Sequence, residues 1–167
     1  MPADFKEIAG EGELTVYKRS QAKNSANVQT SVSFAQSAKT PEELSGKLVN
    51  SCGQPETLNG DEKIYEISVQ YEKENRKGRK EGYDCILSFD YACESMELFV
   101  NGRKVNDYFY TGQKALFSLG YFDFPTEITA VLHPLHEGDH IYLQEWPKMD
   151  DKKACRIETV TLTEQFS

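Results

Sequence analysis

Residues 96–105 read MELFVNGRKV, and this stretch decides the class of fold. Apolar residues recur at every second position from Met96 to Val100, and a period of two places alternate side chains on opposite faces of a strand. Asn101 and Gly102 follow, and both residue types accept the positive φ angles that a two-residue type I′ turn requires. The stretch therefore predicts a β-hairpin that turns at Asn101-Gly102.

The same period of two recurs along the chain. Alternation marks runs at 14–17, 28–34, 65–71 and 85–91, and shorter apolar runs follow at 115–119, 127–132, 140–145 and 156–162. About nine or ten short strands separated by turn residues are typical of antiparallel sheets. The sequence therefore predicts an all-β fold, an antiparallel β-sandwich or jelly roll.

One short helix is predicted within this β domain, near residues 41–49. Thr40 is a suitable N-cap, Pro41 suits the first helical position, and Glu43 at the third position completes a capping box. Apolar residues up to Val49 continue the pattern for about two turns.

Length and composition indicate one globular domain. The chain has 167 residues, of which 38% are hydrophobic and 28% charged. Residues 1–12 are polar and contain glycine, so we expect a flexible N-terminal tail there. We expect a single β-sandwich domain over residues 13–165.

The charge balance argues against two classes of partner. Acidic residues number 27 and basic residues 19, giving a net charge of −8, whereas nucleic acids and anionic membranes bind basic surfaces. The one basic run, at 76–80, is flanked by glutamates and is interpreted as a solvated hairpin tip. The mean hydropathy is −0.62, and no apolar run approaches the roughly 20 residues of a membrane helix.

The four cysteines lack the spacing of a metal site. They are Cys52, Cys85, Cys93 and Cys155. We expect them to be reduced, with Cys85 and Cys155 packed as small apolar residues. Free thiols, together with a start that lacks the features of a signal peptide, favour a reducing compartment such as the cytoplasm.

Four segments resemble parts of the C-terminal β-sandwich of bacterial family 35 β-galactosidases and related glycoside hydrolases. In that family an apolar strand is followed by Asn-Gly-Lys and then Asp-x-Phe-Tyr-x-Gly, and residues 97–112 are similar to this pattern. Residues 64–67, 132–135 and 141–147 are similar to other strands of the same domain. The resemblance covers about residues 61–163.

The resemblance implies a jelly roll of the galactose-binding-domain-like type, which is non-catalytic and attached to a sugar-cleaving enzyme. The expected function is therefore that of a carbohydrate-associated accessory domain with weak glycan binding, whose partners are a glycan or the catalytic domain of a glycoside hydrolase. Two alternatives remain open, namely a structural or protein-interaction module without a ligand, and a small enzyme of unfamiliar type.

Eight residues are candidates for glycan contact. Aromatic rings present a flat apolar face to a sugar, and side-chain amides and carboxylates bind hydroxyl groups. The predicted stacking residues are Trp146, Tyr108, Tyr110 and Tyr121, and the predicted hydrogen-bonding residues are Asn106, Asp107, Gln113 and Gln144. For each aromatic residue the competing interpretation is packing in the core.

No catalytic residue, cofactor or metal site is predicted. The chain lacks the serine-hydrolase elbow, the P-loop and the dinucleotide fingerprint. His133, His136 and His140 lie near Asp139, but the segment is interpreted as a loop with solvated or packed histidines. The one exception considered is a structural Ca²⁺ held by oxygens of Asn106 and Asp107; the alternative is hydrogen bonding to the loop backbone.

Overall fold

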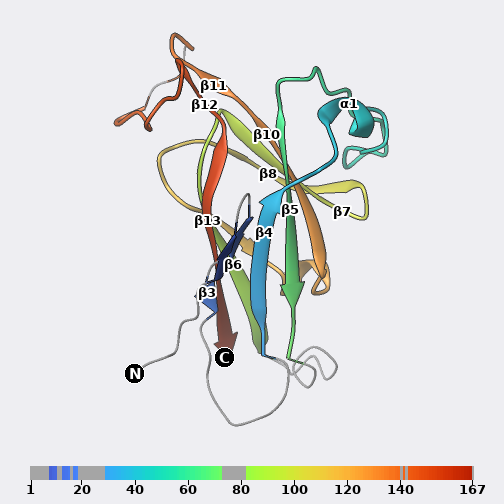
Figure 1. Ribbon diagram of the computed structural model, residues 1–167. Coiled ribbons are helices and arrows are strands. Elements are labelled where there is room, and N and C mark those ends of the chain that lie inside the picture. Colours follow the sequence, from blue (N-terminus) through green and yellow to red (C-terminus); the bar gives the residue numbers. More distant parts are fainter. Residues whose placement is uncertain are drawn as a thin grey trace.

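The body of the molecule consists of two β-sheets, seen in the computed structural model (Figure 1). The structure describes residues 8–10, 13–15, 17–18, 29–72, 82–139, 141 and 143–166. The larger sheet contains, in spatial order, β1 (Ile8–Gly10), β2 (Glu13–Thr15), β4 (Ser31–Gln36), β5 (Lys63–Gln70), β10 (Glu127–His133), β7 (Ser95–Val100) and β8 (Arg103–Phe109). The smaller sheet contains β3 (Tyr17–Lys18), β13 (Arg156–Phe166), β6 (Tyr83–Ala92) and β9 (Ala115–Ser118). The predicted all-β fold in antiparallel sheets is confirmed; among the described strands one pair, β3 and β13, is parallel. The jelly-roll topology stays a prediction.

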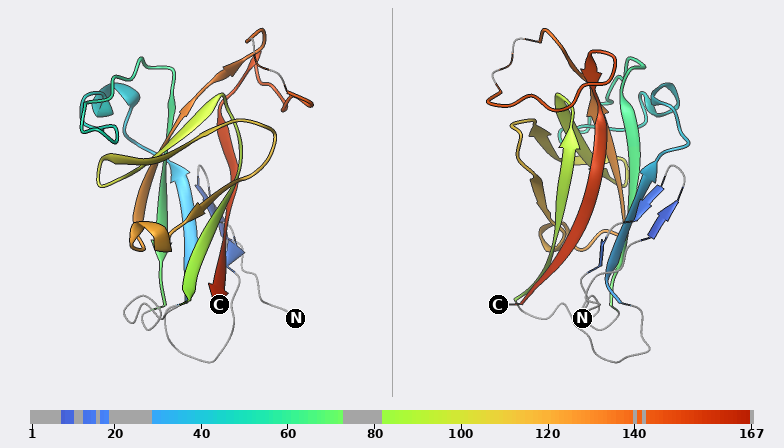
Figure 2. Two further views of the ribbon diagram at one scale, coloured as in Figure 1. Left: turned by 180° about the vertical axis from the view of Figure 1, so that it is seen from behind. Right: turned by 60° about the vertical axis from the view of Figure 1, so that its left-hand side comes forward.

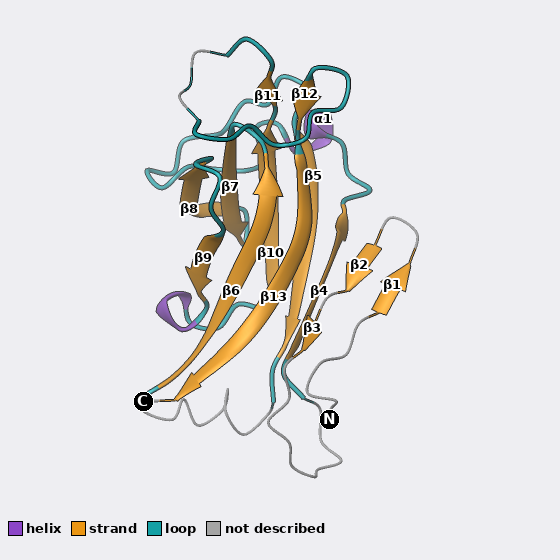
Figure 3. Ribbon diagram, turned by 90° about the vertical axis from the view of Figure 1, so that its left-hand side faces the viewer, coloured by secondary structure: helices purple, strands orange, loops and turns teal. Residues whose placement is uncertain are grey.

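The two sheets share one hydrophobic core. In β5 the buried side chains are those of alternate residues such as Ile67 and Val69, and the same period buries Leu87 and Phe89 in β6. These four side chains belong to one cluster, although they come from different sheets. In Figure 3, β6 and β13 pass in front of β5 and β10. Burial of this shared core is the main stabilising term of such a fold.

The predicted hairpin is present and carries a β-bulge. β7 and β8 are antiparallel neighbours, and the turn residues Asn101 and Gly102 have φ angles of 53° and 79°. The pairing then steps from Phe99–Lys104 to Leu98–Asn106, so β8 contains one extra residue, Val105. A bulge reverses the order of faces along a strand, which matters for the charged residues described below.

The helix is shorter than predicted. α1 spans Pro41–Leu44, and the predicted capping box between Thr40 and Glu43 is present. The helix ends because Ser45 turns to an extended conformation and its hydroxyl accepts the Leu58 N–H, while Gly46 adopts a φ of 82°. The prediction of a helix as far as residue 49 was therefore wrong beyond Leu44. The residues that follow still pack on the outer face of the larger sheet, in a small cluster of Leu44, Leu48, Leu58, Ile64, Phe99 and Val131.

The strand predicted at 140–145 is absent from the described residues there. Ile141 and Leu143 lie instead in a loop of residues 137–152 between two short paired strands, β11 (Leu135–His136) and β12 (Lys153–Ala154). Leu143 is buried in a cluster with Leu135. The apolar residues of this run therefore reflect burial of a loop rather than strand periodicity.

Two predictions fall mainly outside the described residues. Of the predicted tail over residues 1–12, the structure describes only Ile8–Gly10, which forms β1 and pairs with β2; the tail stays a prediction. The basic run at 76–80 lies outside the described residues. Its flanking strands β5 and β6 belong to different sheets, so they do not form the predicted hairpin. Within the part of the chain that is described, no helix has the length and apolar character needed to cross a membrane.

Candidate functional site

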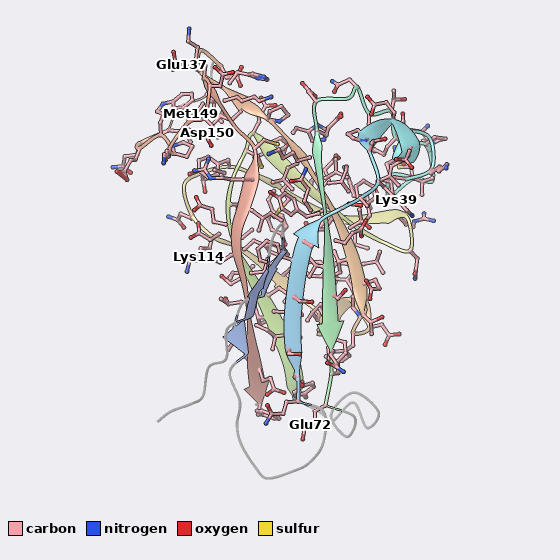
Figure 4. All side chains as sticks on the ribbon, in the orientation of Figure 1. Lys39, Glu72, Lys114, Glu137, Met149 and Asp150 are labelled. Atoms are coloured by element: carbon pink, nitrogen blue, oxygen red, sulfur yellow. The ribbon has the colours of Figure 1, made fainter. Side chains whose placement is uncertain are left out.

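Four of the eight predicted glycan-contact residues lie on two neighbouring loops. Tyr110 and Gln113 belong to the loop of residues 110–114 between β8 and β9, and Gln144 and Trp146 belong to the β11–β12 loop. The two loops lie at the same side of the molecule in both views of Figure 2. Figure 4 likewise labels Lys114 and Met149 on that side. We call Tyr110, Gln113, Gln144 and Trp146 the loop surface.

The packing of Tyr110 ties the two loops together. Its ring packs against the small cluster formed by the β11–β12 end, as do Ile141 and Met149 of the second loop. The ring also meets Tyr91 of β6 edge-on, with centroids 5.5 Å apart. Trp146 is 39% exposed, and both glutamine side chains are exposed. The loop surface thus combines a half-buried ring, an exposed ring and two amide groups.

Arg156 at the start of β13 fixes the backbone of the second loop. Its Nη1 donates a hydrogen bond of 2.8 Å to the carbonyl oxygen of Lys148, two residues after Trp146. Its Nε donates to Glu158 Oε2 at 3.1 Å, and this ion pair holds the guanidinium in place. A charge-assisted hydrogen bond to a loop carbonyl restricts the positions that the loop can adopt.

Burial and nearby charges affect the pKa of Tyr110. Burial raises the pKa of Tyr110, and the carboxylate of Asp90 raises it further, whereas Arg156 opposes this rise. Asp90 and Arg156 were not predicted as site residues. In the sequence they look like ordinary solvent-facing strand residues, and only the pairing of β13 with β6 brings them to this end of the molecule.

The predicted residues in β8 make contacts within the fold. The hydroxyl of Tyr108 donates to the carbonyl oxygen of Leu116 at 2.8 Å and accepts a hydrogen bond of 3.0 Å from Asn106. Burial raises the pKa of Tyr108 to about 12, so the phenol stays protonated. These contacts join β8 to β9, the edge strands of the two sheets on one side. The side chains of Tyr108 and Asn106 are engaged in these contacts, and glycan contact by them stays a prediction.

The oxygens proposed for Ca²⁺ make contacts within the chain. The side-chain oxygen of Asn106 accepts the N–H of Asp107 at 2.9 Å, and Asp107 lies 3.4 Å from the ammonium of Lys104. This is the backbone hydrogen bonding that the sequence offered as the alternative. Among the described residues, no three His, Cys, Asp or Glu side chains are grouped so that they could hold a metal ion. Calcium binding here stays a prediction.

Tyr121 lies at the other end of the molecule. It belongs to the short 3₁₀ helix η1 (Gly120–Phe122), far from β11 and β12 in Figure 3, and is 82% exposed. The carboxylate of Asp84 anchors this turn by accepting the Gly120 N–H at 2.8 Å and the Ser118 hydroxyl at 2.7 Å. Tyr121 therefore does not contribute to the loop surface.

A second group of polar side chains lies on the outer face of the larger sheet. It consists of Glu62, Glu97, Lys104, Asp107 and His133, which we call the Glu97 cluster. Glu97 Oε1 lies 2.7 Å from His133 Nε2, and Glu97 Oε2 lies 3.0 Å from Lys104 Nζ. The bulge at Val105 explains why Lys104 and Asp107, three residues apart, face the same side and meet.

The Glu97 cluster perturbs both members of its histidine–carboxylate pair. The hydrogen bond from His133 lowers the pKa of Glu97, and Lys104 lowers it further. The same hydrogen bond raises the pKa of His133 against the opposing effect of burial. The cluster therefore favours a carboxylate beside an imidazolium. His136 does not join it, because its Nδ1 faces Asp139 at 3.9 Å; His140 lies outside the described residues.

The cysteines are free, and three of the four thiols are buried. Burial raises the pKa of Cys85 to about 12 and that of Cys155 to about 11, and it also raises the pKa of Cys93. These thiols are neutral near pH 7, and a neutral thiol is a poor nucleophile. They act as packing residues, as the sequence predicted for Cys85 and Cys155.

Comparison of the chain with protein-family models, with curated proteins and with solved structures found no match. The resemblance to the family 35 β-galactosidase domain therefore stays a prediction that rests on the residues quoted above.

Proposed function

We propose that the chain is a non-catalytic binding module that contacts a glycan through the loop surface, as an accessory domain of a glycoside hydrolase. The observation that carries this proposal is the packing of Tyr110, from the β8–β9 loop, against the same cluster as Ile141 and Met149 of the loop that also carries Gln144 and Trp146. An exposed ring beside amide groups suits a sugar, whose faces are apolar and whose rim carries hydroxyls.

The state of the reactive groups supports the non-catalytic part of the proposal. The buried thiols are neutral, and both nitrogens of His133 face carboxylates of its own chain. A general base needs a free nitrogen or oxygen within reach of its substrate. A group held by two internal partners is a poor candidate for that role.

The expected affinity is weak. Trp146 provides the most exposed ring of the loop surface, and a single sugar unit desolvates few atoms there. A dissociation constant of about 1 mM corresponds to about −4 kcal/mol, which is typical of one stacking contact with a few hydrogen bonds.

The chain contains one tryptophan, so its fluorescence reports on the proposed site alone. Titration with a galactoside or a related neutral glycan should shift the Trp146 emission and saturate at millimolar concentration. Calorimetry should give the same constant, and Trp146→Ala should abolish the heat of binding. The control is Tyr121→Ala, which removes an exposed ring at the other end and should leave affinity unchanged. Absence of binding by calorimetry across a glycan panel at tens of millimolar would refute the proposal.

A second function, an interaction module without a ligand, is favoured by a separate observation. Phe109 and Leu116 are 71% and 63% exposed, and they lie on β8 and β9, the edge strands of the two sheets. Exposed apolar side chains at a sheet edge are typical of protein contacts. Co-purification with a separately expressed catalytic domain, lost in Phe109→Ser and Leu116→Ser and retained in Trp146→Ala, would favour this function over glycan binding.

A further inference from the structure

We propose that His133 is a pH-sensitive clasp, which holds the turn before β5 against the larger sheet while its ring is charged. The proposal does not depend on glycan binding, and it concerns the Glu97 cluster rather than the loop surface. His133 is the last residue of β10, and its ring lies between two carboxylates that come from different elements.

The geometry places one carboxylate at each ring nitrogen. Nε2 lies 2.7 Å from Glu97 Oε1 of β7, and Nδ1 lies 3.8 Å from Glu62 Oε2 in the turn. A charged imidazolium has an N–H at both positions, whereas a neutral imidazole has only one. The short contact to Glu97 retains that one N–H on Nε2, so loss of the charge leaves a lone pair on Nδ1 facing Glu62.

Glu62 makes the turn sensitive to that loss. Its side chain is only 1% exposed, and its two oxygens accept the N–H groups of Asn59 and Gly60 at 2.9 Å each. The carboxylate therefore organises the turn that leads into β5. A buried carboxylate that loses its cationic neighbour is destabilised, and opening of the turn returns it to water.

The remaining charged groups near the His133 ring determine whether the turn is released as pH rises or as it falls. Asp61, in the same turn as Glu62, adds a further negative charge that raises the pKa of His133. Lys104 and Asp107 of β8 reach the cluster through Glu97, and Lys104 is hydrogen-bonded to that carboxylate. The groups that raise the pKa of His133 are the carboxylates Glu97, Glu62 and Asp61. The turn is therefore held at the lower pH and released as pH rises through the raised pKa of His133.

Hydrogen exchange of the Asn59 and Gly60 amides, measured by NMR and expressed as protection factors, tests the clasp. Linkage predicts that protection falls about tenfold for each unit by which the native contacts raise the pKa of His133. His133→Gln cannot become charged, so its protection factors should be low and independent of pH. His136→Gln, which changes an exposed histidine on β11, should behave like the parent protein.

Titration of the His133 ring signals in the parent protein provides a second readout that needs no variant. We expect the His133 ring signals to change at a higher pH than those of His136, and over the same pH range in which protection at Asn59 and Gly60 falls. Protection factors that stay constant while the His133 ring titrates would overturn the proposal. A pH dependence that persists in His133→Gln would overturn it as well.

Discussion

Replacement of Leu98 by alanine tests whether the two sheets share one core. Leu98 lies in β7 of the larger sheet, is fully buried, and belongs to the cluster that also contains Leu87 of the smaller sheet. A buried leucine-to-alanine change in a packed core costs about 3–5 kcal/mol. With a urea m value of about 2 kcal/mol/M, the unfolding midpoint should fall by about 2 M. Leu116→Ala, at an exposed position of β9, should change stability by less than about 0.5 kcal/mol.

The same experiment on Leu87 distinguishes one core from two. If the sheets unfold together, Leu87→Ala and Leu98→Ala should each shift one common transition, seen identically by circular dichroism and by Trp146 fluorescence. Two separate transitions, each moved by only one of the variants, would refute the shared core.

Three further predictions concern the turn residue Gly102, the loop contact of Arg156 and the ionisable pair of Glu97 and His133. Gly102→Ala places a Cβ at a φ of 79° and should lower the free energy of unfolding by about 1–2 kcal/mol, measured by urea titration; an unchanged midpoint would contradict the turn geometry. Arg156→Met removes a hydrogen bond to the loop that carries Trp146, so acrylamide should quench Trp146 more efficiently, while unaltered quenching would show that the arginine does not position the loop. Stability should decline on both sides of a pH window. On the acid side, the lowered pKa of Glu97 gives stability that is present above the ordinary carboxyl value of 4.5 and is lost as pH falls through the native pKa. On the alkaline side, the raised pKa of His133 gives stability that is present below the ordinary histidine value of 6.5 and is lost as pH rises through the native pKa. His133→Gln should remove the alkaline decline in thermal melts and reduce the acid decline, because His133 is also the main cause of the lowered pKa of Glu97. An alkaline decline of parental size in that variant would contradict this assignment.

Local chemistry made the strands and the hairpin predictable. The alternation at 85–91 matches the buried residues of β6, because one face of that strand packs on the core and the other faces outward. Asn101-Gly102 forms the predicted turn, since the required positive φ angles depend on those two residues alone. The capping box of α1 was likewise local and present.

Features that depend on tertiary contacts could not be predicted from the sequence. The helix stops at Leu44 because Ser45 bonds to Leu58, thirteen residues away. In β13, the bulge at Glu158 lets Ile157 and Val160 both face the core, although their spacing breaks the period of two.

The residues of the candidate site likewise fall into those that the sequence could predict and those that depend on tertiary contacts. Rings and amides could be proposed as glycan contacts from residue type, and four of the eight residues named lie in the two loops that carry the loop surface. The pairing of Glu97 with His133 joins residues 36 positions apart, so only the register of β7 against β10 reveals it. The role of Arg156 depends on its hydrogen bond to the carbonyl oxygen of Lys148, and no pattern in the residues around Arg156 predicts that contact.

Mapping a neutral galactoside onto the backbone amides by heteronuclear NMR tests the central claim most directly. Binding through the loop surface predicts that the saturable shifts concentrate in residues 110–114 and 143–148 and in the indole N–H of Trp146. Shifts that centre instead on Tyr121 or on β8, or a spectrum that does not change at tens of millimolar sugar, would contradict it.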